Sequence, residues 1–226
     1  MSKIASADTQ PPFNAGCRDC PRLAGFLDQV RLKNPQYFSR PVPPFGDPQA
    51  EFLIVGLAPG MHGANRTGRP FTGDFAGILL YETLHEYGFA SQKGSDNPAD
   101  GLQLINCRIT NAVKCLPPQN KPETSEIRTC NKYLESEIRT SSPKVILVLG
   151  AIAHQSVLMA FGLKLRDYRF GHHATHTLGA KGDGGGEVRL FDSYHCSRYN
   201  TQTRRLTPDM FRAVVSDIRD CLTSGR

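Results

Sequence analysis

The stretch IVGLAPGMHGANRTGRPFTGDFAG, residues 54–77, carries the main evidence for the fold. It begins within an apolar run, residues 53–55, that is typical of a buried strand. Glycines then recur through a long loop, which lets the backbone approach a ligand closely. After Gly77, apolar residues recur at helical spacing. A strand, a Gly-rich loop and a helix in this order place the loop where open α/β sheets bind ligands.

The polar residues of this loop are of types that take part in catalysis and binding. They are His62, Asn65, Arg66, Thr67, Arg69, Thr72 and Asp74. Phe71 stands among them without apolar neighbours that would indicate a core position. The loop contains neither G-x-x-x-x-G-K-[ST] nor G-x-G-x-x-G. A functional loop is therefore favoured over a phosphate-binding turn or an ordinary surface loop.

Length and composition indicate a soluble globular protein. The 226 residues suit a single domain, 1–226, with a loose N-terminus at 1–13. No stretch approaches the roughly 20 apolar residues of a membrane span, and the first ten residues lack the apolar run of a secretory signal. We expect a monomer in the cytoplasm, associated with the nucleoid and not with a membrane.

The charge balance favours a polyanionic partner. The formal net charge is +6, and such an excess favours nucleic acid without proving it. Arginines lie beside residues suited to sugar and phosphate contacts in RTGR, residues 66–69, and in RYNTQTRR, residues 198–205. The predicted phosphate contacts from these segments are Arg66, Arg69 and Arg198.

Alternating strands and helices predict a three-layer α/β/α sandwich with a mostly parallel central sheet. The predicted strands cover 51–57, 102–113, 144–149 and 188–194. The predicted helices cover 21–35, 77–88, 123–140, 151–161 and 208–222. We expect an extended connector at 41–46, a weak hairpin with a flexible tip within 167–187, and a loop at 195–207.

Polar groups follow three of the predicted strands: the 58–77 loop, Asn111 and His195. Each has an ordinary explanation, because His195 suits a surface, Asn111 suits a turn and Asp74 suits a helix N-cap. The carboxyl ends of parallel strands meet at one edge of a sheet, however. This convergence favours a functional site.

The seven cysteines argue against a disulfide framework in a cytoplasmic chain. Cys17, Cys20, Cys115 and Cys130 can hold either a [4Fe–4S] cluster or zinc, since both accept four thiolates. Spacing alone does not decide between them. Cys107 falls inside a predicted strand, where a buried thiol is expected.

Histidines at 172, 173 and 176 form H-H-x-x-H in a Gly-rich region. This pattern is compatible with a metal site, but no cluster of carboxylates accompanies it in the sequence. We therefore interpret these histidines as solvated.

Three motifs resemble those of family 5 uracil-DNA glycosylases. They are G-L-A-P-G-x-x-G-x-N-R-T-G-R-x-F-T-G-D from Gly56, N-A-V-K-C-x-P-P from Asn111 and H-x-S-x-x-N-T-Q-T from His195. The resemblance extends from about Cys17 to the closing helix, and it is closer than the resemblance to the related family 4 enzymes, which share the cysteine pattern.

The resemblance implies an α/β/α sandwich, a four-cysteine [4Fe–4S] cluster and excision of uracil from DNA, often with other deaminated bases such as hypoxanthine or xanthine. By motif, Asp74 and His195 take the catalytic positions, Asn111 the base-reading position and Phe71 the stacking position. The loop that begins at His195 is the one that enters the duplex. Family members usually have Pro after this His, whereas this chain has Cys196, and the loss of Pro loosens the backbone.

The resemblance also implies a wider set of contacts. Further substrate-binding positions are Gly56, Ala58, Gly60, His62 and Asn65, and further DNA-binding positions are Ser197 and Asn200. For His62, both a place in the pocket and a phosphate contact stay open.

The chemistry of base excision suits these residue types. A glycosylase flips the nucleotide into a pocket, where an aromatic face can stack on the base and an amide such as Asn111 can both donate and accept. Leu57 and Ala58 stand where other families place an acid or amide, so Asp74 is the acid available in this loop. His195 would donate to uracil O2 as negative charge develops there. Its protonation state is left open.

Two other functions remain possible at this point. One is a nucleic-acid-binding module with a structural metal cluster and an inactive pocket. The other is a nucleotide-binding hydrolase that uses the Gly-rich loop on phosphates, and the absence of a P-loop lysine argues against it.

Overall fold

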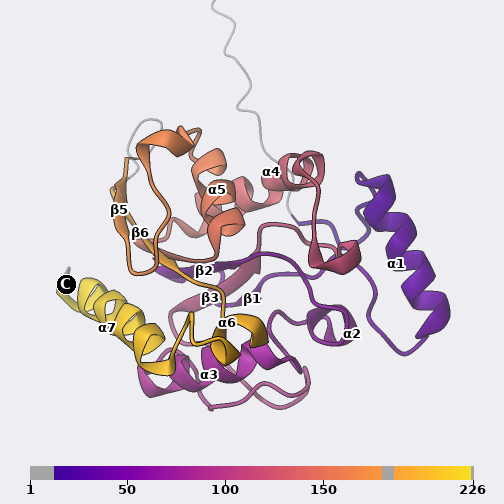
Figure 1. Ribbon diagram of the computed structural model, residues 1–226, viewed down its shortest axis with the longest axis horizontal. Helices are drawn as coiled ribbons and strands as arrows, with labels where there is room; N and C mark the ends of the chain where they lie inside the picture. Colours follow the sequence, from indigo (N-terminus) through magenta and orange to yellow (C-terminus); the bar gives the residue numbers. More distant parts are fainter. Residues whose placement is uncertain (1–12, 180–185, 225–226) are drawn as a thin grey trace, which may run out of the picture.

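One six-stranded sheet organises the computed structural model, which describes residues 13–179 and 186–224 (Figure 1). The strand order is β1-β3-β2-β4-β6-β5. The four central strands, in this order, are β3 (Cys107–Asn111), β2 (Phe52–Gly56), β4 (Val145–Leu149) and β6 (Val188–Ser193), and they are parallel. The edge strands β1 (Phe45–Gly46) and β5 (Thr175–Leu178) are antiparallel. The prediction of a mostly parallel sheet is therefore confirmed.

Helices cover both faces of this sheet, as the three-layer prediction requires (Figure 1). One face packs against α3 (Phe75–Glu86) and α7 (Pro208–Ser224), and the other packs against α4 (Thr124–Ser141) and α5 (Ala151–Ala160). Strand β2 shows the reason: Phe52 and Ile54 contribute to the first core, and Leu53 and Val55 to the second. Because successive strand residues point to opposite faces, an entirely apolar strand holds both layers.

Helix α1 (Pro21–Lys33) stands beside the sheet and begins just after Cys20 (Figure 1). Short elements complete the described chain: α2 (Ala64–Thr67), α6 (Arg198–Gln202) and the 3-10 turns η1 (Pro118–Asn120) and η2 (Leu165–Asp167). The 195–207 segment, predicted as a loop, thus contains a helix, and the 41–46 connector contains β1. Elements this short give no apolar periodicity in the sequence, which is why they were missed.

The hairpin predicted within 167–187 differs from the structure: the described part of this segment contains one strand, β5, and its antiparallel partner is the last strand, β6. The expected flexible tip includes residues 180–185, and the expected loose N-terminus includes residues 1–12; both lie outside the described residues. Helix α4 begins with a capping box formed by Glu123 and Glu126. Across the described ranges, no helix combines the length and apolar character of a membrane span.

Candidate active site

A cavity of about 370 Å³ opens at the carboxyl ends of the parallel strands. It is lined by the loop after β2, the end of β3, the β4–α5 turn and the segment after β6. The sequence-predicted residues that line it are Ala58, Gly60, Phe71, Asp74, Asn111, His195 and Ser197. The predicted convergence of three polar strand ends is confirmed.

Asp74 is both a helix cap and a cavity residue. Its Oδ1 accepts a hydrogen bond of 2.9 Å from the backbone N–H of Gly77, which caps α3. Its Oδ2 lies beside Gly63, where an added Cβ would approach Oδ2 to 2.3 Å. Gly63 thus leaves room for the carboxylate. The two explanations of Asp74 do not compete, because one oxygen caps the helix while the carboxyl group lines the cavity.

Burial raises the pKa of Asp74 above its usual value, and hydrogen bonds from the backbone N–H groups of Gly77 and Ala76 offset part of that rise. Partial desolvation makes a carboxylate more responsive to a nearby positive charge, because the local dielectric constant is lower than in water. The environment of Asp74 suits a group that stabilises developing cationic charge.

Phe71 is held in a conformation that an aromatic residue rarely adopts. Its φ is +53°, a left-handed value that costs free energy for a non-glycine residue and is found most often at functional sites. Its ring centroid lies 5.9 Å from that of His195, at an interplanar angle of 32°. A Cβ at Gly56 would come within 2.7 Å of the Phe71 ring, so this glycine is required behind the aromatic wall.

Asn111 has an unpaired acceptor at the cavity. The residue is 4% exposed, and its Oδ1 is buried with no hydrogen-bond partner in the described part of the chain. An unpaired buried acceptor costs about 1–3 kcal/mol. A ligand that brings an N–H donor into the cavity would satisfy this atom.

His195 is neutral at neutral pH. Burial of the imidazole lowers its pKa to about 4, and no group of the described chain hydrogen-bonds to the ring to offset this effect. The neutral ring keeps one N–H donor. The lowered pKa favours the neutral form of the ring over the imidazolium.

The segment around His195 is fixed from both sides. Cys196 is completely buried in the core, so the backbone is anchored here without the usual Pro. Ser197 caps α6 by accepting from the Asn200 N–H, and the Asn200 side-chain amide donates to the His195 carbonyl at 2.9 Å. The amide N–H of Asn200, predicted to contact DNA, is thus engaged in positioning His195.

Three predicted substrate residues do not line the cavity: Gly56, His62 and Asn65. Asn65 is fully buried in α2, away from the cavity lining, and both polar atoms of its side chain lack partners in the described structure. His62 is exposed, and its Nδ1 lies 2.8 Å from the Tyr37 hydroxyl. The structure does not bring the side chains of His62 and Asn65 to the cavity lining, and a phosphate contact stays open for the exposed His62.

The guanidinium of Arg69, which was predicted to contact DNA, lies in the interior of the protein instead. The side chain is 6% exposed, and its Nη2 donates to Asp100 at 2.6 Å and to Ser95 Oγ at 2.7 Å. Its Nε donates to Thr72 Oγ1 at 2.8 Å. Arg69 therefore ties the loop that carries Phe71 to the 95–100 turn. The other two arginines predicted to contact phosphate, Arg66 and Arg198, are exposed. The Arg198 guanidinium lies 5.1 Å from the centroid of the Phe75 ring. Both side chains are available to a phosphate backbone.

We expect Arg69→Ala to lower the free energy of unfolding by about 1–3 kcal/mol, because it leaves the half-buried Asp100 carboxylate and the buried Ser95 hydroxyl without this partner. Arg66→Ala is the matched control from the same motif, and its effect should stay within about 0.5 kcal/mol because the side chain is exposed. Urea titrations of both variants measure the difference. Equal stability of the two variants would contradict the structural role of Arg69.

The fourth wall of the cavity was not predicted from the sequence. Leu149, Gly150, Ala151 and Ile152 line it from the β4–α5 turn. Gly150 has φ +100°, a value that favours glycine, and its N–H donates to the Ser193 carbonyl at 2.8 Å. The sequence signal that could have revealed this wall is the glycine that follows a fully apolar strand.

Four cysteines form a second centre. Cys17, Cys20, Cys115 and Cys130 line one cavity between the start of α1, the segment after β3 and helix α4. The Lys114 N–H donates to Cys130 Sγ at 3.3 Å. Burial, together with the neighbouring thiols, raises the pKa of Cys20 to about 11, and burial likewise raises the pKa values of Cys115 and Cys130.

None of the seven cysteines takes part in a disulfide within the described residues. Cys107 is completely buried within β3, as expected.

An α/β/α sandwich with a cavity at the carboxyl ends of its parallel strands defines a class of α/β proteins that bind ligands at this edge. Within this class, residues 43–219 match the family model described as "Uracil DNA glycosylase superfamily". The chain belongs to this superfamily.

Relatives agree with the match. A "Type-5 uracil-DNA glycosylase" of Thermus thermophilus is 44% identical over 209 residues, which cover 90% of this chain and 92% of the relative. One of Mycobacterium leprae is 42% identical over 225 residues, 94% of this chain and 96% of the relative. A "Type-4 uracil-DNA glycosylase" of Sulfurisphaera tokodaii is 31% identical over 182 residues, 79% of this chain and 75% of the relative.

Proposed function

We propose that the protein is a DNA repair glycosylase that flips uracil out of DNA and hydrolyses its N-glycosidic bond. The observation that carries the proposal is the meeting of Asp74, Asn111, His195 and Phe71 in one cavity. The similarity to proteins named Type-5 uracil-DNA glycosylase supports it. A DNA substrate would place the protein with the nucleoid, where we expect it to act as a monomer.

The base would be held between Phe71 and Asn111. The Phe71 ring offers a stacking face, and the unpaired Asn111 Oδ1 offers an acceptor for uracil N3–H. The amide NH₂ of the same side chain can donate to O4. Because an amide does not exclude other deaminated bases, hypoxanthine and xanthine are further candidate substrates.

Hydrolysis breaks the bond between deoxyribose C1′ and the base nitrogen, and a water oxygen forms the new bond to C1′. Asp74 would stabilise the cationic sugar and accept a proton from the attacking water, as a carboxylate does in glycoside hydrolysis. The base leaves with its electron pair, and negative charge develops on O2. The neutral His195 ring would donate its N–H to that oxygen, a role in which preorganised donors are effective.

Release of free uracil from a uracil-containing oligonucleotide tests the function. The proposed enzyme releases uracil and leaves an abasic site without cutting the strand. The alternative, a non-catalytic nucleic-acid-binding module with a structural metal cluster, binds the same oligonucleotide and releases nothing. Chromatographic detection of uracil under single-turnover conditions separates the two.

Asn111→Ala should reduce uracil excision by more than it weakens binding to undamaged DNA. The variant removes two hydrogen bonds to the base and leaves the phosphate contacts from Arg66, Ser197 and Arg198 in place. A side chain that makes two good hydrogen bonds to a base contributes about 1–3 kcal/mol to base discrimination. The excision rate should therefore fall by roughly 5- to 150-fold. Single-turnover rates and duplex affinities measured together provide the check. An unchanged rate would show that Asn111 does not read the base.

We further propose that Cys17, Cys20, Cys115 and Cys130 bind a [4Fe–4S] cluster. A single zinc ion with four thiolates brings the sulfur atoms to within about 3.8 Å of one another, given Zn–S bonds of about 2.3 Å. Among the described residues, the only group of three or more candidate ligand atoms within 4.8 Å of one another contains none of these sulfurs. The wider spacing supports a larger, multi-iron group. The cluster would join α1 to the segment after β3 and supply structural stability.

Protein purified without oxygen should be brown and contain about four irons per chain, as the [4Fe–4S] composition requires. Cys115→Ser should lower both iron content and soluble yield, because metal binding is coupled to folding. Cys221→Ser is the control, since this thiol lies outside the centre and should retain the iron. A colourless protein with one zinc per chain would overturn the cluster proposal.

A further inference from the structure

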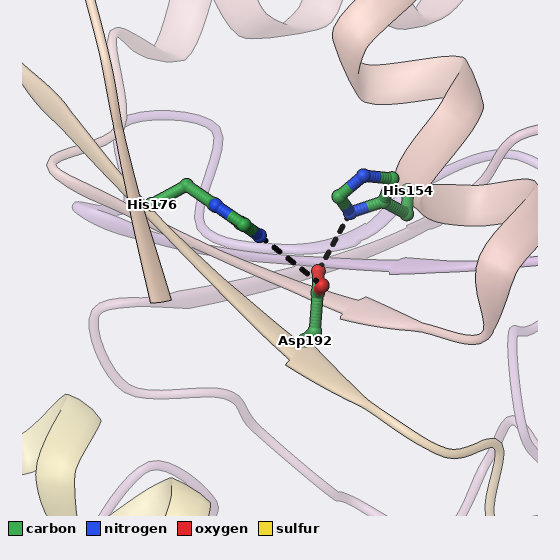
Figure 2. A group of neighbouring side chains, drawn as sticks. All are labelled: His154, His176 and Asp192. Atoms are coloured by element: carbon green, nitrogen blue, oxygen red, sulfur yellow. Dashed lines mark hydrogen bonds and ion pairs between the residues drawn. The ribbon is translucent and has the colours of Figure 1, made fainter. Parts of the chain in front are cut away.

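Three potential metal ligands meet at the edge of the sheet farthest from the cysteine centre. His154 comes from α5, His176 from β5 and Asp192 from β6, and both imidazoles point toward the carboxylate (Figure 2). The three candidate ligand atoms lie within 4.8 Å of one another. The side chains of His154 and Asp192 are 0% exposed, and that of His176 is 17% exposed. The interpretation of His176 as solvated was therefore wrong.

The hydrogen bonds of His154 leave one ring nitrogen directed at the carboxylate. Its Nε2 lies 2.9 Å from the Tyr168 carbonyl, and a carbonyl only accepts, so Nε2 carries the hydrogen. Its Nδ1 lies 2.8 Å from Asp192 Oδ1. A lone pair on Nδ1 cannot face a carboxylate oxygen at that distance without repulsion. A second proton on Nδ1 satisfies this contact as it stands, and a metal ion that replaces the proton would be held by the same two atoms once they move apart to the spacing of metal ligands.

His176 presents a similar arrangement from the other side. Its Nε2 lies 3.4 Å from Asp192 Oδ2, yet the atom is buried and makes no hydrogen bond within the described structure. A buried nitrogen without a partner carries a desolvation cost. A metal ion between these three residues would satisfy this atom and the Nδ1 of His154 together.

We propose that His154, His176 and Asp192 bind a divalent transition-metal ion of the zinc type. Two imidazoles and a carboxylate are ligands that zinc accepts, with bonds of about 2.0–2.2 Å. Tetrahedral bonds of this length separate neighbouring ligand atoms by about 3.3–3.6 Å. The observed separations of 2.8 Å and 3.4 Å need only small side-chain shifts to match this geometry. Magnesium and calcium prefer oxygen ligands and fit the nitrogen-rich set poorly.

The surroundings fit a structural metal. The Tyr168 carbonyl fixes the His154 ring, and the Gly171 N–H donates to Asp192 Oδ2 at 3.2 Å, as outer contacts of metal ligands do. The ring of Phe170 lies 5.6 Å from that of His154, which shields the site. The ion would link α5, β5 and β6, and His195 follows β6 directly beyond Tyr194. This metal is independent of the proposed iron–sulfur cluster, since the two sites share no residue.

The test uses the full-length protein with its native metal content. Total metal analysis and calorimetric titration with Zn²⁺ should together give one zinc per chain at this site. His176→Ala should lower the zinc affinity by more than the roughly 10- to 100-fold that loss of an outer-shell partner causes. Zinc should also raise the melting temperature of the wild type and leave that of His176→Ala nearly unchanged.

His173→Ala is the matched control. This neighbouring histidine is partly exposed, pairs with Asp217 at 2.8 Å and lies outside the cluster, so the variant should bind zinc as the wild type does. His176→Gln is a second variant that preserves polarity if the Ala variant folds poorly. Equal zinc affinity in the wild type and both His176 variants would overturn the proposal. Zinc binding that disappears only in Cys115→Ser would overturn it too, because the ion would then belong to the cysteine centre.

Discussion

Asp74→Asn should lower the single-turnover rate of uracil release by about 10²- to 10⁴-fold, the usual loss for a positioned acid–base group. The amide keeps an oxygen that can accept from the Gly77 N–H, so the cap of α3 survives. It removes the negative charge that would stabilise the cationic sugar and the site that would accept the water proton. The melting temperature should therefore change little while the rate falls.

Asp74→Ala is the matched variant, because it removes the charge and the cap together. It should lose about as much rate as Asp74→Asn and in addition about 0.5–2 kcal/mol of stability. Thermal melts and single-turnover assays on the two variants separate the two functions of one carboxyl group. Full activity in Asp74→Asn with a destabilised Asp74→Ala would mean that Asp74 is only a cap and that the catalytic carboxylate lies elsewhere.

His195→Ala should lower the rate of uracil release by about 10²- to 10³-fold, the loss typical for one donor to a developing anion. This range overlaps that for Asp74, so the size of the loss does not assign the roles. The effect of changing the leaving base assigns the two roles instead. The 5-fluorouracil anion is more stable than that of uracil and needs the His195 donor less, so 5-fluorouracil should partly rescue His195→Ala. It should not rescue Asp74→Asn, because the sugar cation is the same for both bases.

The pH profile provides a second check on His195. Since burial holds its pKa at about 4, the ring stays neutral from mildly acidic to alkaline pH. The wild-type rate should then show no inflection near the usual histidine pKa of about 6.5. A fall in rate as pH rises through about 6.5 would mean that the imidazolium is the active form. Equal rescue of His195→Ala and Asp74→Asn by 5-fluorouracil would contradict the separate roles.

Several features of the molecule follow from local sequence alone. The apolar run before Gly150 is buried on both faces as β4 because five consecutive apolar residues have no polar face to expose. The Gly-rich sequence after β2 predicts a ligand-binding loop because glycine lets the backbone approach a ligand closely, and residues of this loop line the cavity. Asp74 caps α3 because a short carboxylate before a helix reaches the N–H groups of its first turn. Each depends only on residues near one another in the chain.

The three-dimensional contacts decided the rest. The sequence suggested that Arg69 contacts phosphate and that His176 is solvated. In the structure, Asp100 and Ser95 accept hydrogen bonds from the Arg69 guanidinium in the interior. Strand β5 places His176 against Asp192. The low pKa of His195 and the unpaired oxygen of Asn111 likewise arise from burial by distant segments. Sequence determines which groups are available and how each local element forms. Packing between segments far apart in the chain determines which groups are desolvated, which are paired and which remain free for a ligand.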